Sequence, residues 1–121
     1  MLRQVSRSLL PEDIRSKVIQ DLIGHMRETM RDAPGVGLAA PQIGESLQLA
    51  VIEDKADYHK GLTEAELRER QRIPIDFHVI INPQIELLSP PENSFFEGCL
   101  SISGFMAAVS RSQSVRVTCL D

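Results

Sequence analysis

One long amphipathic pattern near the N-terminus limits the folds open to this chain. Between Glu12 and Arg31, apolar residues recur at every fourth position, and Pro11 and Pro34 stand on either side of the segment. The repeating positions are Ile14, Val18, Leu22, Met26 and Met30. This spacing predicts one amphipathic helix with an apolar stripe. Such a helix must bury its stripe against another element, so we expect it to cover one face of a sheet.

The rest of the chain carries short apolar runs that indicate strands. These runs are 47–52, 77–82, 85–88, 104–109 and 114–120. A doubly wound parallel sheet needs helices between its strands. Only the polar segment 55–72 offers one, at 64–72, where Thr63 and Glu66 have the spacing of a capping box. The sequence therefore predicts an α+β fold with an N-terminal helix packed on short, mostly antiparallel strands.

Composition fits one soluble globular domain and excludes several protein classes. The 121 residues are 42% apolar and 25% charged, which suits a single domain at 1–121. A net charge of −4 argues against nucleic-acid binding. No apolar run is long enough for a membrane span. Arg3 and Arg7 interrupt the apolar segment that a signal sequence needs. An organelle transit peptide is the less favoured interpretation of these two arginines. Two cysteines, Cys99 and Cys119, form no disulfide framework and indicate a reducing compartment.

Residues 35–44 form an unusual stretch with three glycines and two alanines, which leaves the backbone accessible to a ligand. Gly35, Gly37 and Ala40 match part of a dinucleotide-binding fingerprint. That fingerprint follows a strand and opens a helix, whereas this segment follows a helix and contains Pro41, so nucleotide binding is disfavoured. A tight packing loop is the alternative. Gln42 needs a hydrogen-bond partner here, from the backbone or from a ligand.

A second segment, 97–101, reads Glu-Gly-Cys-Leu-Ser. On its own, a lone cysteine such as Cys99 is more often a small buried apolar residue than a nucleophile. The Gly-x-Ser-x-Gly elbow is absent, and the spacing of His25, His59 and His78 does not indicate a catalytic dyad with Cys99. This segment alone therefore assigns no function.

Together, the two segments resemble the first two motifs of the peptide deformylase family. The first motif, Gly-Φ-Gly-Φ-Ala-Ala-x-Gln with Φ apolar, is matched from Gly35 to Gln42, and the second, Glu-Gly-Cys-Φ-Ser, from Glu97 to Ser101. Their order and separation make the resemblance specific, and it covers nearly the whole chain. The family's third motif, His-Glu-Φ-x-His on a metal-binding helix, is missing from these residues. We expect it to lie beyond residue 121, in which case the chain is truncated at its C-terminus.

The resemblance implies hydrolysis of the N-formyl group from the initiator methionine of nascent peptides, a step of protein biosynthesis. It implies a divalent metal, Fe²⁺ with Zn²⁺, Ni²⁺ or Co²⁺ as substitutes, and Cys99 as its thiolate ligand. The Gln42 side chain and the Leu100 backbone N–H would stabilise the oxyanion. The residues implied to contact substrate are Val36, Gly37, Gly98 and Phe95. Formylmethionyl peptides and the ribosome are the implied partners, without nucleic-acid or membrane binding. A bacterial-type cytoplasm is the implied location, ahead of an organelle stroma or matrix.

Two alternatives stay open beside this interpretation. One is an inactive or binding-only relative, and the other is an amidohydrolase with a cysteine nucleophile. Because a catalytic metal takes about three protein ligands and only Cys99 is at hand, activity of these 121 residues alone is not expected. Glu97 and Arg111 are candidates for a structural ion pair behind the site, unless Arg111 is a solvated surface residue. Ser101 is expected to make local backbone hydrogen bonds rather than to act in catalysis.

Overall fold

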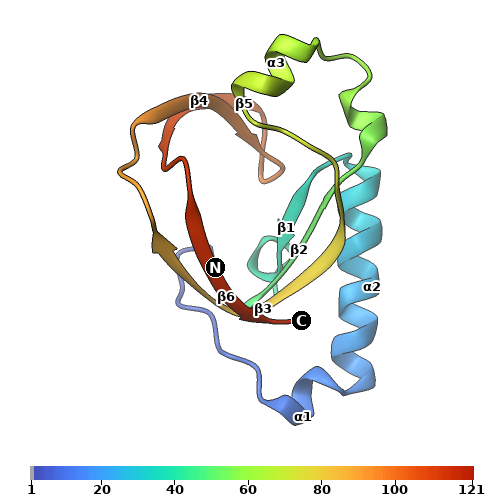
Figure 1. Ribbon diagram of the computed structural model, residues 1–121. Helices are drawn as coiled ribbons and strands as arrows, with labels where there is room; N and C mark the ends of the chain where they lie inside the picture. Colours follow the sequence, from blue (N-terminus) through green and yellow to red (C-terminus); the bar gives the residue numbers. More distant parts are fainter. Residues whose placement is uncertain (1) are drawn as a thin grey trace.

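The computed structural model describes residues 2–121, without the side chain of Ser103. The helices are α1 (Pro11–Ile14), α2 (Lys17–Asp32) and α3 (Glu64–Glu69), with short 3-10 turns η1 (Ala40–Ile43) and η2 (Ala56–His59). The strands are β1 (Gly37–Ala39), β2 (Leu49–Asp54), β3 (Ile75–Leu87), β4 (Asn93–Cys99), β5 (Ile102–Arg111) and β6 (Val115–Leu120). They form a four-stranded antiparallel sheet in the order β1-β2-β3-β6 and a separate hairpin, β4–β5. Figure 1 shows α2 beside the larger sheet and the hairpin near α3, so the predicted α+β class is confirmed.

The N-terminal helix is divided, although the apolar spacing predicted a single helix over 12–31. Ser16 stands between α1 and α2, where its hydroxyl donates to the Asp13 carbonyl (2.6 Å) and accepts from the Ile19 N–H (3.3 Å). A serine in this role is a preferred N-cap, so it starts a new helix at Lys17. The prediction of one uninterrupted helix is therefore wrong at its first turn.

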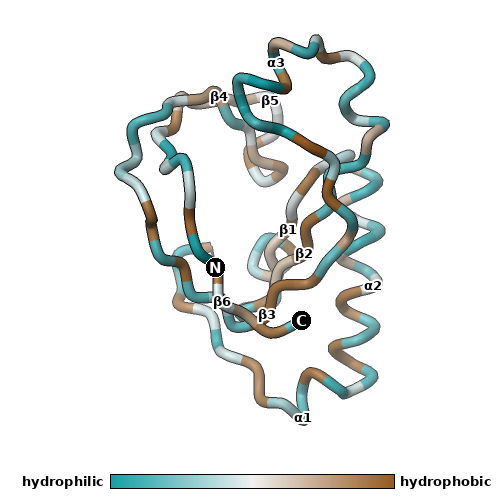
Figure 2. The backbone as a smooth tube through the Cα atoms, viewed as in Figure 1, coloured by the Kyte–Doolittle hydropathy of each residue, from teal (hydrophilic) through white to brown (hydrophobic). Residues whose placement is uncertain are grey.

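The apolar stripe of α2 differs from the predicted one at a single exposed position. The residues it buries are Ile19, Met26 and Met30, whereas Val18 is 75% exposed. With 3.6 residues per turn, positions spaced by exactly four drift around the helix axis, so one stripe cannot contain all five predicted members. Figure 2 shows the hydrophobic side of α2 facing the larger sheet. The core there consists of the helix methionines with Leu38, Leu49, Val51 and Ile81.

One ion pair fastens α2 to this sheet on the inward face of β2. Glu53 is buried and accepts two hydrogen bonds from Arg31, both of 2.8 Å. These bonds hold the pKa of the Glu53 carboxyl below its ordinary value and keep it ionised. A buried carboxylate without a partner would be strongly destabilising, so the pairing explains how an acid occupies the face shared with Leu49 and Val51.

The third strand runs through the Asn82-Pro83 dipeptide, where the sequence predicted a break between two strands. The pairing of β3 with β6 shifts between Ile81 and Gln84, and Asn82 adopts a left-handed φ of 51°. Asparagine tolerates this conformation better than most residues, so a bulge absorbs the break and the ladder continues. The Asn82 amide also binds the backbone of Leu9, accepting from its N–H (2.8 Å) and donating to its carbonyl (2.9 Å).

Other predicted boundaries were close to those observed. The Thr63–Glu66 capping box is confirmed by reciprocal hydrogen bonds of 3.1 and 2.8 Å. Helix α3 ends at Glu69 rather than at residue 72, and the strand predicted at 47–52 lies at Leu49–Asp54. The strands predicted at 104–109 and 114–120 correspond to β5 and β6. Within the described residues, no helix is long and apolar enough to cross a membrane.

Candidate active site

The two motif segments, far apart in the sequence, meet through Gln42 and Cys99. Gln42 lies in η1, directly after β1, and its Nε2 atom is 3.5 Å from Sγ of Cys99 and 3.0 Å from Oγ of Ser101. The Gln42 Oε1 atom accepts a hydrogen bond from the Ala39 N–H (2.9 Å). Because the oxygen is held by the backbone, the amide presents its N–H groups to the cysteine segment. The expected backbone partner of Gln42 is therefore present, and two side chains of the second motif bind its amide nitrogen.

Ser101 was expected to hydrogen-bond to the local backbone, but its partner in the structure is a distant side chain. Its hydroxyl oxygen accepts from the Gln42 amide across the site. The cause is the turn after Cys99, which brings Ser101 to face η1 instead of its own backbone. Ser101 thus helps to orient Gln42.

Strand β1 offers an open hydrogen-bonding edge beside this pair. It stands at the end of the sheet order and, within residues 2–121, pairs with β2 alone. The Glu53 N–H donates to the Val36 carbonyl (3.0 Å), and antiparallel pairs alternate between bonded and non-bonded. The backbone N–H and carbonyl of Gly37 therefore point away from β2, toward the open edge. At the same edge, the Ala39 N–H already donates a hydrogen bond to the Gln42 side chain.

A cavity of about 720 Å³ brings together six of the seven predicted site residues. They are Val36, Gly37, Gln42, Gly98, Cys99 and Leu100. A Cβ atom on Gly35 would lie 2.9 Å from Cδ1 of Leu100, so a glycine there lets the two motif segments approach closely. Phe95 is absent from this cavity and lines another one, of about 700 Å³, together with Arg111.

The large apolar side chains of β5 that line the cavity were not identified from the sequence: Ile102, Phe105 and Met106. They belong to β5, which folds back along β4 with Gly98 opposite Met106. Their positions depend on the tight turn at residues 100–101. A hairpin prediction for 93–111 would have placed them next to Cys99, but the motif residues themselves carry no such signal.

The predicted ion pair between Glu97 and Arg111 is confirmed. The guanidinium donates two hydrogen bonds to the carboxylate, 2.8 and 2.6 Å long, across the β4–β5 hairpin. These bonds hold the pKa of Glu97 below its ordinary value near 4.5 and raise the pKa of Arg111. The pair fixes the strand that ends in Cys99.

Replacing Glu97 by glutamine is expected to lower the free energy of unfolding at pH 7 by about 0.5–1 kcal/mol, since the pair is partly exposed to solvent. Because the pKa of Glu97 is lower in the native state, the pair stabilises the fold at pH values above the ordinary pKa near 4.5. This stabilisation is lost as the pH falls through the native pKa. Urea unfolding at pH 7, 5 and 4 measures the difference. Glu92→Gln, in the turn before β4, is the control; equal losses in both variants at pH 7 would contradict a role for the pair.

The donor set around Cys99 does not by itself complete a metal site. Among residues 2–121, no three His, Cys, Asp or Glu side chains converge to hold a metal ion. His25, His59 and His78 lie on α2, η2 and β3, and none of them lines the Cys99 cavity. Cys119 lies on β6. One thiolate is fewer than the three protein ligands that a catalytic metal usually takes.

Comparisons with known proteins agree with this arrangement of motifs. The family model for polypeptide deformylase matches residues 1–121. Peptide deformylase 1A of tomato chloroplasts is 44% identical over 121 residues, which are 100% of this chain and 44% of that protein. Peptide deformylase of Leptospira biflexa is 40% identical over 119 residues, covering 97% of this chain and 61% of the relative. The chain thus spans about half the length of the curated relatives it matches.

Solved structures give the same result. A peptide deformylase from Legionella pneumophila is 38% identical with a TM-score of 0.74, covering 99% of this chain and 59% of that one. A class I type b peptide deformylase from Acinetobacter baumannii, 24% identical with a TM-score of 0.80 over 98% of this chain and 68% of that one, shares the fold. With a family match over its whole length, the chain belongs to the polypeptide deformylase family.

Proposed function

We propose that the protein containing this chain hydrolyses the formyl group from N-formylmethionyl nascent peptides. The observation that carries the proposal is the Gln42 amide facing Cys99 at 3.5 Å, in a cavity bordered by a free strand edge. In the reaction, water adds to the formyl carbon, the C–N bond breaks, and formate and the free amine of methionine are formed. The ribosome is the proposed source of the peptide and the cytoplasm the proposed location; the relatives include plant organellar and bacterial deformylases.

The free edge of β1 is suited to an extended peptide. A peptide strand can add to an open sheet edge through main-chain hydrogen bonds, and the N–H and carbonyl of Gly37 point to that edge. Because Gly37 has no side chain, the peptide backbone can approach without steric hindrance. Val36, Gly98 and Met106 line the same cavity and offer apolar surface for the methionine side chain. Phe95, which lines a separate cavity with Arg111, stays a proposed substrate contact.

The oxyanion that forms when water attacks needs donors already in place. The Gln42 amide and the Leu100 backbone N–H are the proposed donors, since both residues line the cavity beside Cys99. Fixed donors of this kind lower the barrier without reorganising during the reaction. Cys99 is the proposed contribution of this chain to a divalent metal, with Fe²⁺ as the proposed ion. The other metal ligands would come from residues outside 2–121, because no group of three or more His, Cys, Asp or Glu within this range could hold the ion.

Formate release tests the proposal. We expect the full-length protein, purified with Fe²⁺ under reducing conditions, to release formate from formyl-Met-Ala-Ser and nothing from acetyl-Met-Ala-Ser. Chelation of the metal should stop the reaction. Absence of formate with every divalent ion supplied would contradict the proposal and indicate a binding-only relative. Chelator-resistant activity that iodoacetamide abolishes would instead indicate a cysteine nucleophile.

A further inference from the structure

The turn that follows α3 contacts both sheets. Helix α3 ends at Glu69, and Gln71 adopts a left-handed φ of 52°. The Arg72 N–H donates back to the Leu67 carbonyl (2.8 Å), which closes the helix end in the manner of a C-terminal cap. The reversal at Gln71 separates two arginines, Arg70 and Arg72, whose side chains bind different parts of the fold.

Arg72 fastens this turn to the four-stranded sheet. Its guanidinium donates two hydrogen bonds, 2.8 and 2.9 Å long, to Asp54 at the end of β2. Nε2 of His59 lies 3.0 Å from the same carboxylate. The bonds from Arg72 hold the pKa of Asp54 below its ordinary value, and only 13% of the Asp54 side chain is exposed. This anchor is therefore well shielded and charged at neutral pH.

Arg70 reaches in the other direction, to the hairpin. It donates a hydrogen bond of 3.0 Å to the backbone carbonyl of Phe96, and its guanidinium lies over the Phe95 ring at 5.2 Å. Among the described strands, β4 pairs with β5 alone, so the Phe96 carbonyl accepts a side chain instead of a further strand. The charge of Arg70 also adds to the effect of Arg111 in lowering the pKa of Glu97.

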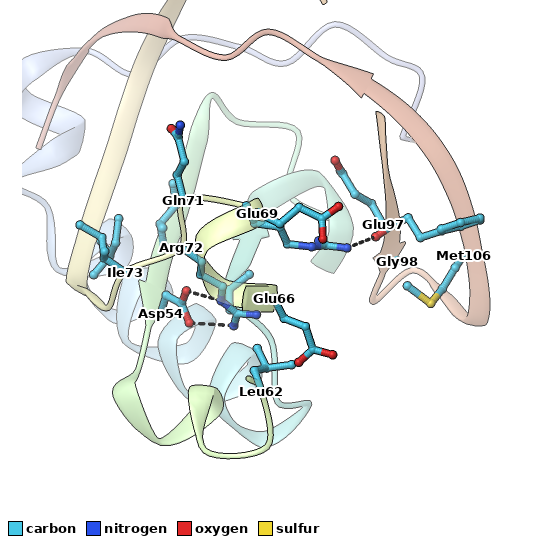
Figure 3. Close-up of a pocket in the computed structure, with 15 residues that line it drawn as sticks. Asp54, Leu62, Glu66, Glu69, Gln71, Arg72, Ile73, Glu97, Gly98 and Met106 are labelled. Atoms are coloured by element: carbon cyan, nitrogen blue, oxygen red, sulfur yellow. Dashed lines mark hydrogen bonds and ion pairs between the residues drawn. The ribbon is translucent and has the colours of Figure 1, made fainter. Parts of the chain in front are cut away.

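The two anchors lie on a cavity next to the site. Figure 3 shows the Asp54–Arg72 pair facing Gly98 and Met106 across this cavity, whose volume is about 880 Å³. Val36, Gly98 and Met106 line both this cavity and the one that contains Cys99. The distance between the hairpin and the four-stranded sheet at the Arg70–Arg72 turn therefore affects the width of the cavity that contains Cys99.

Few hydrogen bonds from side chains join the hairpin to the rest of the described fold. In the described part of the chain, the side chains outside the hairpin that hydrogen-bond to β4 or to its turn are those of Gln42 and Arg70. Gln42 belongs to the site itself. We propose that Arg70 is a positioning residue, which holds β4 at the distance where Cys99 and the Leu100 N–H face Gln42. This inference rests on the proposed deformylase function.

Three variants of the full-length protein test the role of Arg70. Arg70→Ala removes the contact, Arg70→Lys retains the charge, and Arg68→Ala, in the last turn of α3, is the control, since Arg68 is exposed as Arg70 is. We expect Arg70→Ala to lower kcat/KM for formyl-Met-Ala-Ser by about 10- to 100-fold, mainly through kcat, because misplaced donors act on the transition state. Arg70→Lys should recover part of the loss, and Arg68→Ala should match wild type.

Hydrogen exchange provides a readout that does not depend on activity. In Arg70→Ala we expect the amides of 93–100 to exchange faster by about threefold or more, with those of 49–54 unchanged, because only the hairpin loses an attachment. Exchange or kcat equal to that of Arg68→Ala, or a loss confined to KM, would overturn the positioning role. If wild type releases no formate, the proposed function fails, while the exchange rates still decide whether Arg70 holds the hairpin.

Discussion

Replacing Cys99 by alanine is expected to reduce formate release by the full-length protein to background and to remove its bound divalent metal. Cys99 is exposed, lies at the end of β4 and lines the cavity that it shares with Gln42. The thiolate is the form of cysteine that binds metal, and losing one of about three protein ligands leaves a catalytic ion poorly held. Metal analysis and formate release, measured on the same preparation, check this result.

Cys119 provides a matched control for this experiment. It is also exposed and free of disulfides, but it lies on β6 and does not line the Cys99 cavity. Cys119→Ala should therefore keep both the metal and the activity. A Cys119→Ala protein without metal, beside a Cys99→Ala protein that retains it, would reverse the assignment. Retained metal with lost activity in Cys99→Ala would favour a nucleophilic cysteine.

The class of the fold could be predicted because its elements carry strong local signals. Helix α2 has an apolar stripe, α3 has the Thr63–Glu66 capping box, and the apolar run at 114–120 lies close to the observed bounds of β6. The details that the sequence did not predict depend on single side chains and their tertiary partners. Ser16 divides the first helix by capping the second, and Asn82 lets β3 continue through a bulge. Such roles depend on tertiary partners, which periodicity does not contain.

The candidate site was predictable in its motif residues and unpredictable in its surroundings. Gln42 and Cys99 stand in two short segments whose patterns are specific, and the structure brings them within 3.5 Å. Arg70 and Met106 carry no comparable pattern. Met106 reaches the site through the pairing of β4 with β5, and the turn at Gln71 directs Arg70 to β4. Packing determines which distant segments pair. Sequence patterns therefore predict the segments but not how they pair.

Replacing Gln42 by leucine is expected to lower kcat/KM by about 10²- to 10³-fold with the metal retained, the usual cost of losing one oxyanion donor. The donor faces an oxygen whose charge develops only when water attacks, so the loss should appear in kcat. Gln113→Leu, an exposed glutamine in the turn before β6, is the control and should match wild type in formate release.

A second substitution separates this chemical role of Gln42 from its structural one. Leucine also leaves the Ala39 N–H without its acceptor, at a cost of about 1–3 kcal/mol where that group is buried. Gln42→Glu keeps the oxygen that accepts from Ala39 (2.9 Å in wild type) and replaces the amide donor by an acceptor. If Gln42 stabilises the oxyanion, Gln42→Glu should have near-wild-type stability in urea yet lose as much kcat as Gln42→Leu, because a carboxylate facing the oxyanion repels it. A normal kcat with a raised KM in either variant would show that Gln42 binds the substrate in its ground state and contributes nothing specific to the transition state.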